Sequence, residues 1–326
     1  MARKLLAAAV GVCSICLAAA QPAGASVDQP AAPSSTPTGG QIGYQGGAVE
    51  WYRPTVYLVF WGSWWVTHGG AQKKALEDLF TWIGSPADNW SHVIDQYCLD
   101  AVPPPDPPNA GWTGCPDVGV VGSVLLGSAV DPVDPPEAPT QAQLAVEARF
   151  PFETSEKVLN TYDTYAVIPM IVTPPGVFPR TELDGKACGH HWWGWANHSP
   201  GNPEGPQQWS PFAYAVDSYA ASDSTNNRSA GGCTNNKDVT AGLTITASHE
   251  FAEAVTDPFP ITGRFYDPDH VFYADLQPGW TNNDDPAEIG DPCRGPSNDF
   301  HIKFAGETLY LQKLWSNLAR DCVRSA

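Results

Sequence analysis

Five stretches of the chain are rich in β-branched, aliphatic and aromatic residues, and they predict strands. Residues 54–61 (PTVYLVFW) and 165–172 (YAVIPMIV) are apolar almost throughout, which is typical of strands buried inside a domain. Weaker stretches lie at residues 118–126, 212–216 and 309–315. We therefore expect a central sheet in which two strands are fully buried.

Between these strands, apolar residues recur at helical spacing. Residues 71–83 (AQKKALEDLFTWI) are the clearest example and contain few helix breakers. A longer helix is predicted over residues 238–256, and Asp257-Pro258 ends it because proline disfavours a helical residue before it. Further helical stretches lie at residues 89–97, 141–150 and 155–162. The alternation of strands and helices predicts a single α/β domain with a central mixed sheet.

The first 47 residues differ from the rest in composition. A short positive start and an apolar stretch, residues 5–20, precede Ala23-Gly24-Ala25, the small-residue pattern that a signal peptidase cleaves. This stretch is too short to be a membrane span. We therefore expect residues 1–25 to be a secretory signal peptide, residues 26–47 a flexible Pro/Ser/Thr-rich linker, and residues 48–326 the folded domain of an extracellular protein.

The cysteines fit export into an oxidising compartment. Of eight cysteines, two lie in the predicted signal peptide, which leaves an even number for disulfides. No CxxC pair remains to suggest a cysteine metal site. Proximity in the sequence favours the pairs Cys98–Cys115, Cys188–Cys233 and Cys293–Cys322, although six cysteines permit other pairings.

The charge balance argues against nucleic acids and anionic membranes as partners. There are 17 Lys and Arg against 35 Asp and Glu, a net charge of -18. Nucleic acids and anionic membranes are bound through clustered basic residues, so neither is expected as a partner. The acidic balance fits solubility outside a cell, and we expect a monomer that acts on an extracellular peptide or protein.

The segment His249-Glu250-Phe251-Ala252-Glu253 carries the most specific chemistry. On the predicted helix, His249 and Glu253 are four residues apart and share a face. The pattern resembles the HExxH motif of zinc proteases, with a carboxylate, also an accepted zinc ligand, in place of the second histidine. His249 and Glu253 would then bind the metal and Glu250 would act as general base. Alternatively, both glutamates are solvated helix charges and the histidine is a satisfied structural residue.

A zinc site needs at least one more protein ligand. Glu288 and Asp291 are the first candidates, since they lie in a compact acidic element beside a cysteine, one as ligand and the other orienting a ligand. His191 is the next, either as a ligand or as a catalytic donor to the oxyanion. Asp257 fits a helix cap better than a ligand. The remaining candidates are Asp267, Asp269 and His270.

Six elements of the chain, taken in order, form a pattern: Gly46-Gly47-Ala48-Val49, residues 54–62, Cys188-Gly189-His190-His191, residues 248–254, residues 288–293 and residues 312–317. Together they resemble the phosphate-induced protein (EXORDIUM-like) family, in particular its secreted bacterial members. Two features depart from the family pattern, Trp192 after the second of these histidines and an apparent insertion at residues 261–276. The resemblance implies an extracellular protein, and it supports a metal site built from His249, Glu253 and the separate acidic elements.

These observations together predict a secreted, metal-dependent hydrolase, most simply a zinc peptidase with a zincin-like layout around a long active-site helix. Ca²⁺ is an alternative to zinc, because one histidine with several carboxylates is a hard donor set. Two other functions fit the same residues. One is a non-catalytic extracellular binding or signalling protein, and the other is a cell-wall polysaccharide hydrolase, for which paired carboxylates such as Glu250 and Glu288 could serve.

Overall fold

The computed structural model describes residues 42–49, 53–97, 120, 122–159, 166–180, 188–197, 209–219, 238–267, 272–282 and 287–326. All of them belong to one compact unit. The expected signal peptide and most of the expected linker lie outside the described residues. None of the described helices is long and apolar enough to cross a membrane.

A five-stranded mixed sheet forms the centre of this unit, in the order β3-β2-β4-β6-β5. Four strands run parallel, and β5 lies antiparallel to β6 at one edge. Their bounds are β2 Thr55–Trp61, β3 Leu125–Asp131, β4 Val167–Thr173, β5 Gly189–Asn197 and β6 Trp209–Ser218. The predicted α/β fold with a central mixed sheet is confirmed.

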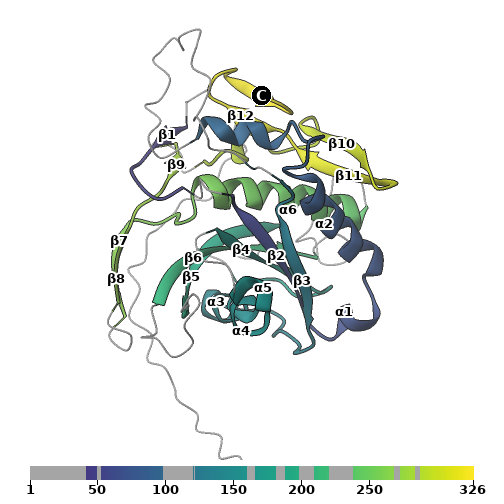
Figure 1. Ribbon diagram of the computed structural model, residues 1–326, viewed down its shortest axis with the longest axis vertical. Helices are drawn as coiled ribbons and strands as arrows, with labels where there is room; N and C mark the ends of the chain where they lie inside the picture. Colours follow the sequence, from purple (N-terminus) through teal and green to yellow (C-terminus); the bar gives the residue numbers. More distant parts are fainter. Residues whose placement is uncertain are drawn as a thin grey trace, which may run out of the picture. The chain divides into compact units, whose positions relative to one another are not determined.

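Helices cover both faces of the sheet, as Figure 1 shows. On one face lie α2 (Gly70–Trp82) and α6 (Val239–Thr256), and on the other lie the shorter α3 (Gln141–Glu147), α4 (Phe150–Thr154) and α5 (Glu156–Leu159). Alternate residues of each strand point to opposite faces. In β2, Leu58 and Phe60 therefore join the core under α2 and α6, whereas Val59 and Trp61 join the core on the other side.

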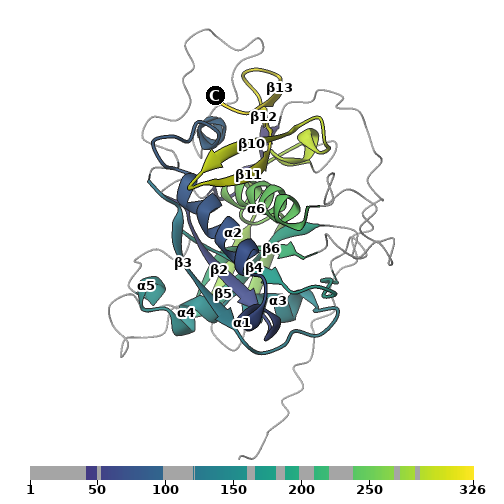
Figure 2. The same cartoon turned by 90° about the vertical axis from the view of Figure 1, so that its right-hand side faces the viewer.

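A second layer packs on the far side of α6 from the sheet, visible in Figures 1 and 2. The antiparallel hairpin of β10 (Asp299–Phe304) and β11 (Glu307–Gln312) contacts this helix through β11. As a result α6 is covered on all sides, and 15 of its 18 residues are buried. A helix that is apolar or buried all round belongs in the core of a domain rather than on its surface.

Shorter elements complete the described part of the chain. They are β1 (Gly43–Tyr44), which pairs with β9 (Trp280–Thr281); α1 (Trp64–Thr67); η1 (Ser91–Gln96); the hairpin of β7 (Gly263–Asp267) and β8 (Phe272–Leu276); η3 (Asp291–Cys293); and the hairpin of β12 (Leu314–Ser316) and β13 (Asp321–Val323). The segment expected as an insertion thus forms the β7–β8 hairpin, whose connection lies outside the described residues.

Two predicted strands are displaced or divided. The strand expected at residues 118–126 begins only at Leu125 and runs to Asp131, because Gly127 packs against the ring of Tyr57 and the small residues there hide the apolar pattern. The strand expected at residues 309–315 divides at Lys313. Residues up to Gln312 pair with β10, and the backbone N–H of Lys313 still donates to the carbonyl of Asn298 beside that pair, whereas residues from Leu314 onward pair with β13.

One of the three expected disulfides is confirmed. Cys293 in η3 is bonded to Cys322 in β13. Cys188 is also disulfide-bonded. Cys98, Cys115 and Cys233 lie outside the described residues, so the other two pairings stay predictions.

Candidate metal centre

Four parts of the chain bring together the residues singled out in the sequence. Helix α6 carries His249, Glu250 and Glu253, and β5 carries His191. Glu288 lies in the segment before η3, and Asp291 begins η3 itself. The predicted helix over residues 238–256 is confirmed, with Asp238 accepting a hydrogen bond from the backbone of Thr240 as N-cap and Asp257 as C-cap.

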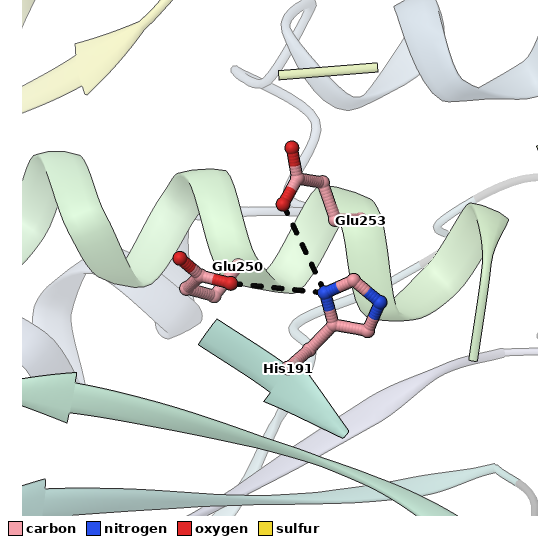
Figure 3. A group of neighbouring side chains, drawn as sticks. All are labelled: His191, Glu250 and Glu253. Atoms are coloured by element: carbon pink, nitrogen blue, oxygen red, sulfur yellow. Dashed lines mark ion pairs between the residues drawn. The ribbon is translucent and has the colours of Figure 1, made fainter. Parts of the chain in front are cut away.

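The sheet determines the direction of His191. In the antiparallel pair β5–β6, His191 lies opposite Ala215, and Ala215 belongs to the core under α6. Opposite residues of such a pair share a face, so His191 points at the helix. Figure 3 shows its ring facing Glu250 and Glu253. Its Nδ1 lies 3.7 Å from Glu250 Oε2 and 3.8 Å from Glu253 Oε2.

The other ring nitrogen of His191 has a fixed partner. Nε2 lies 2.8 Å from the backbone carbonyl oxygen of Asp257, at the end of α6. A carbonyl only accepts hydrogen bonds, so Nε2 must carry the proton. In the neutral histidine, Nδ1 then keeps its lone pair toward the two glutamates. This is the second-shell arrangement that orients histidine ligands of metal ions.

His249 is oriented in the same way by Gln312, which belongs to the β10–β11 hairpin on the other side of α6. The Nε2 atom of His249 lies 3.0 Å from Glu253 Oε1, 3.7 Å from Asp291 Oδ1 and 4.0 Å from Glu250 Oε1. Its Nδ1 lies 3.3 Å from Gln312 Oε1. Gln312 donates its amide to the carbonyl of Gly290 at 2.5 Å, which leaves Oε1 as the acceptor for His249. Both histidines therefore present one nitrogen to the same group of carboxylates.

Burial makes these carboxylates costly without a compensating cation. His191, His249, Glu250 and Glu253 each expose 6% or less of their surface. Glu250 Oε2, Glu253 Oε1, Glu288 Oε2 and Asp291 Oδ1 accept no hydrogen bond of good geometry, although each lies within ion-pair distance of a histidine or arginine nitrogen. Buried carboxylate oxygens normally have partners or bind metals. The alternative that the two helix glutamates are solvated surface charges is therefore wrong.

The pKa shifts reflect this concentration of charge. Burial raises the pKa of Glu253, and the nearby Asp291 adds to the effect. Burial also raises the pKa of Glu288 far above its ordinary value, with a further contribution from Glu253. Burial lowers the pKa of His249, but the carboxylate of Glu253 outweighs it and raises that pKa to about 9. These shifts show that gathering several carboxylates in a buried place favours a positive charge beside them.

Glu250 behaves differently from its neighbours. Burial alone would raise its pKa, but His191 and His249 flank the carboxylate, and together they lower the pKa below the ordinary value. This shift favours the ionised form of Glu250. An ionised carboxylate is the form that can bind a cation or accept a proton.

The acidic element of Glu288 and Asp291 is anchored on both sides. Ile289 is fully buried in the core, and its carbonyl accepts a hydrogen bond from the backbone of Trp315. The disulfide of Cys293 follows directly. Glu288 Oε2 lies 3.4 Å from His191 Nε2, the outward nitrogen of that ring.

Asp291 also pairs with Arg294, whose side chain is 62% exposed against 20% for Asp291. Both helix glutamates are almost completely buried. Among the described residues, exposure therefore rises from the helix toward η3, and solvent approaches the group from that side.

Two groups of side chains have ligand atoms close enough together to hold a metal ion. One is His191, Glu250 and Glu253, and the other is His249, Glu253 and Asp291. Imidazole and carboxylate are both donors that zinc accepts. The donor set, its burial and its free oxygens thus fit a metal ion, as expected from the helix motif.

Most of the residues predicted for the site lie in it, but the structure adds one that was not predicted. The six predicted site residues come together, but Glu288 stays outside both groups, and Asp257 contributes its backbone carbonyl. The side chain of Asp267 and all of Asp269 and His270 lie outside the described residues. Sequence reasoning gave Gln312 no role in the site, although Gln312 follows the apolar Leu309 and Leu311 and begins the element 312–317 on which the family resemblance rests.

The sequence also gave no indication that Gly290 lies close to His249 and Glu253. A Cβ atom there would lie 2.5 Å from His249 Nδ1 and 2.9 Å from Glu253 Oε1. Gly189, in β5, likewise leaves room for Glu250, since a Cβ atom would lie 2.8 Å from its Cγ.

Comparisons of the chain with protein-family models, with curated proteins and with solved structures found no match. The resemblance to the EXORDIUM-like family and the zincin-like layout stay predictions.

Proposed function

We propose that this protein is a secreted, metal-dependent hydrolase, with zinc as its ion and an extracellular peptide as its substrate. The observation that carries the proposal is the arrangement of two buried histidines. Each has one ring nitrogen bound to a fixed acceptor, and each directs the other nitrogen at Glu250 and Glu253. Buried carboxylates without hydrogen-bond partners between two such histidines favour a cation over a purely structural ion pair.

His249, Glu253 and Asp291 would hold the ion, since their ligand atoms form one of the two groups described above. A zinc ion bound there would polarise a carbonyl and lower the pKa of a water molecule. Gln312 fixes the ring of His249, and the disulfide of Cys293 fixes the backbone beside Asp291. The ligands are therefore oriented before any metal binds, which favours affinity.

Glu250 is the residue proposed as general base. It lies next to His249 in the helix, is not one of the three ligands above, and places Oε1 4.0 Å from His249 Nε2. A general base must be deprotonated and within reach of the water it activates. His191 faces Glu250 from the sheet, where it can serve as a further ligand or donate to the oxyanion.

Two measurements test this proposal together. Metal content is determined by elemental mass spectrometry on the purified mature protein, and hydrolysis is followed with a peptide library. We expect bound zinc, loss of the ion of the His249 group in His249→Ala, and hydrolysis that Glu250→Gln abolishes while that ion stays bound. Glu147→Gln, which removes a buried carboxylate on the opposite face of the sheet, is the control and should change neither result.

A non-catalytic binding protein with a structural ion is the second candidate, and the deep burial of Glu250 and Glu253 favours it. The same variants separate the two functions. Retained metal with no peptide cleavage, by wild type or Glu250→Gln, would support the structural ion and refute the peptidase. A polysaccharide hydrolase would instead release sugars from a cell-wall preparation and leave the peptides intact.

A further inference from the structure

Glu253 belongs to both groups of potential ligands, and its two oxygens face different histidines. Oε1 lies 3.0 Å from His249 Nε2, and Oε2 lies 3.8 Å from His191 Nδ1. Glu250 repeats this arrangement, with Oε1 at 4.0 Å from His249 Nε2 and Oε2 at 3.7 Å from His191 Nδ1. Two carboxylates therefore span the space between two histidine nitrogens.

We propose that the site binds two divalent metal ions, bridged by Glu253, rather than one. This inference rests on the proposed metal site and deepens it. The first ion would take His249, Glu253 Oε1 and Asp291, and the second would take His191, Glu253 Oε2 and Glu250 Oε2. Two ions that share a carboxylate lie about 3.5–4 Å apart in dinuclear hydrolytic sites.

The distances between ligand atoms agree with this assignment. Atoms bound to one zinc at about 2.0–2.2 Å lie roughly 3–4 Å from one another. Within the proposed ligand sets, the separations from each histidine nitrogen are 3.0 and 3.7 Å around His249 and 3.7 and 3.8 Å around His191. Neither ion would need a large movement of the backbone.

A single ion in the His249 group leaves His191 without a role as a ligand. With only the His249 group occupied, His191 would still direct a lone pair at Glu250 Oε2, a buried oxygen that accepts no hydrogen bond. Asp257 holds the outward nitrogen of His191 in the position that a ligand requires. The ring of His191 is thus oriented for binding an ion in the same way as the ring of His249.

The charges favour more than one ion. Five carboxylates interact in this buried region: Glu250, Glu253, Asp257, Glu288 and Asp291. Three of them, Glu250, Glu253 and Asp291, belong to the two ligand groups. One divalent ion compensates only two of these three negative charges, and of the three Arg294 pairs with Asp291 alone. Buried charge that remains uncompensated is costly, so the second ion is favoured.

Glu250 keeps a role in hydrolysis under this assignment. It binds the second ion through Oε2 and leaves Oε1 on the side of His249, where it can still accept a proton. Replacement by glutamine removes that proton acceptor without removing the ligands of the first ion.

The number of ions per chain tests the inference directly. The purified protein is stripped, reconstituted with excess Zn²⁺, desalted and analysed by elemental mass spectrometry. We expect two zinc ions in wild type, one in His191→Ala, one in His249→Ala, and two in the control Glu147→Gln. One ion in wild type that His249→Ala removes and His191→Ala does not would overturn the dinuclear site and leave the proposed hydrolase intact. No ion in wild type would overturn both.

A second measurement needs no variant and therefore does not depend on whether a variant folds. Wild-type protein reconstituted with Mn²⁺ is examined by electron paramagnetic resonance. Two ions bridged by one carboxylate should give an exchange-coupled signal, which appears as the second equivalent of Mn²⁺ is added. A signal of isolated Mn²⁺ only, at every ratio of metal to protein, would refute the bridge.

Discussion

Gly290 is the position at which a one-carbon change tests the candidate site most directly. Its backbone has φ −83° and ψ −34°, which any residue adopts, so alanine meets no conformational obstacle. The obstacle is the lack of room for a Cβ atom at this position. An added Cβ would lie 2.5 Å from His249 Nδ1, 2.7 Å from its Cε1 and 2.9 Å from Glu253 Oε1. All three contacts are closer than those that real Cβ atoms make.

The size of the effect follows from these contacts. Ordinary contact begins at 3.4 Å, so against 2.5 Å the histidine ring or the η3 segment must move by about 0.9 Å. Overpacking of this kind costs about 1–3 kcal/mol of folding free energy, less the roughly 0.4–1 kcal/mol that alanine contributes by restricting the unfolded chain. We therefore expect Gly290→Ala to lose about 1–2 kcal/mol of stability without metal. Displacing His249 should also weaken metal binding by about 10–100-fold, as changes to ligand orientation do.

Urea denaturation in the presence of a chelator measures the loss of folding stability. Repeating it with saturating Zn²⁺ measures the loss of metal binding, because an ion that binds only the folded state adds to the stability. Competition with a chromophoric chelator gives the affinity independently. Gly70→Ala is the matched control, since Gly70 begins α2 in open space and should leave stability and metal affinity unchanged or slightly improved. Wild-type metal affinity in Gly290→Ala would show that the segment before η3 does not pack against His249, and the reasoning about the site would fail.

Three further predictions concern other parts of the structure. Gln312→Leu should weaken zinc binding by about 10–100-fold. Gln312→Glu should weaken it less, since glutamate keeps an acceptor for His249 but loses the donor to the carbonyl of Gly290; chelator competition compares the two. Replacing both cysteines of the disulfide between η3 and β13 by serine, a loop of 29 residues, should cost about 3 kcal/mol in urea denaturation and loosen Asp291. Burial and then Asp131 raise the pKa of Glu147 to about 8 from an ordinary 4.5. The folded protein therefore holds a proton that the unfolded chain releases, stability falls as the pH rises through this window, and Glu147→Gln should flatten that fall in urea midpoints measured across it.

Local patterns were sufficient for the parts of the fold that depend on local interactions. The runs at residues 54–61 and 165–172 are apolar because β2 and β4 lie in the middle of the sheet, with helices on both faces. The helix over residues 238–256 was recognisable from its spacing and from Asp257-Pro258 at its end. The shared face of His249 and Glu253 followed from the helical period alone.

Other features depend on partners far apart in the sequence, which no local pattern encodes. Residues 189–197 show no alternation that predicts a strand, and only the pairing of β5 with β6 turns His191 toward α6. The hairpin of β10 and β11 covers the second side of α6, and Gln312 at its end contacts His249.

The two-sided arrangement of the candidate site has the same origin. The motif on α6 predicted one metal ion with ligands on one helix face. Because the sheet supplies His191 from one side and β11 orients His249 from the other, Glu253 faces a histidine with each of its oxygens. The spacing of residues along the chain thus identified the ligand types, whereas the packing of layers around a buried helix decided their number, their orientation and their charge.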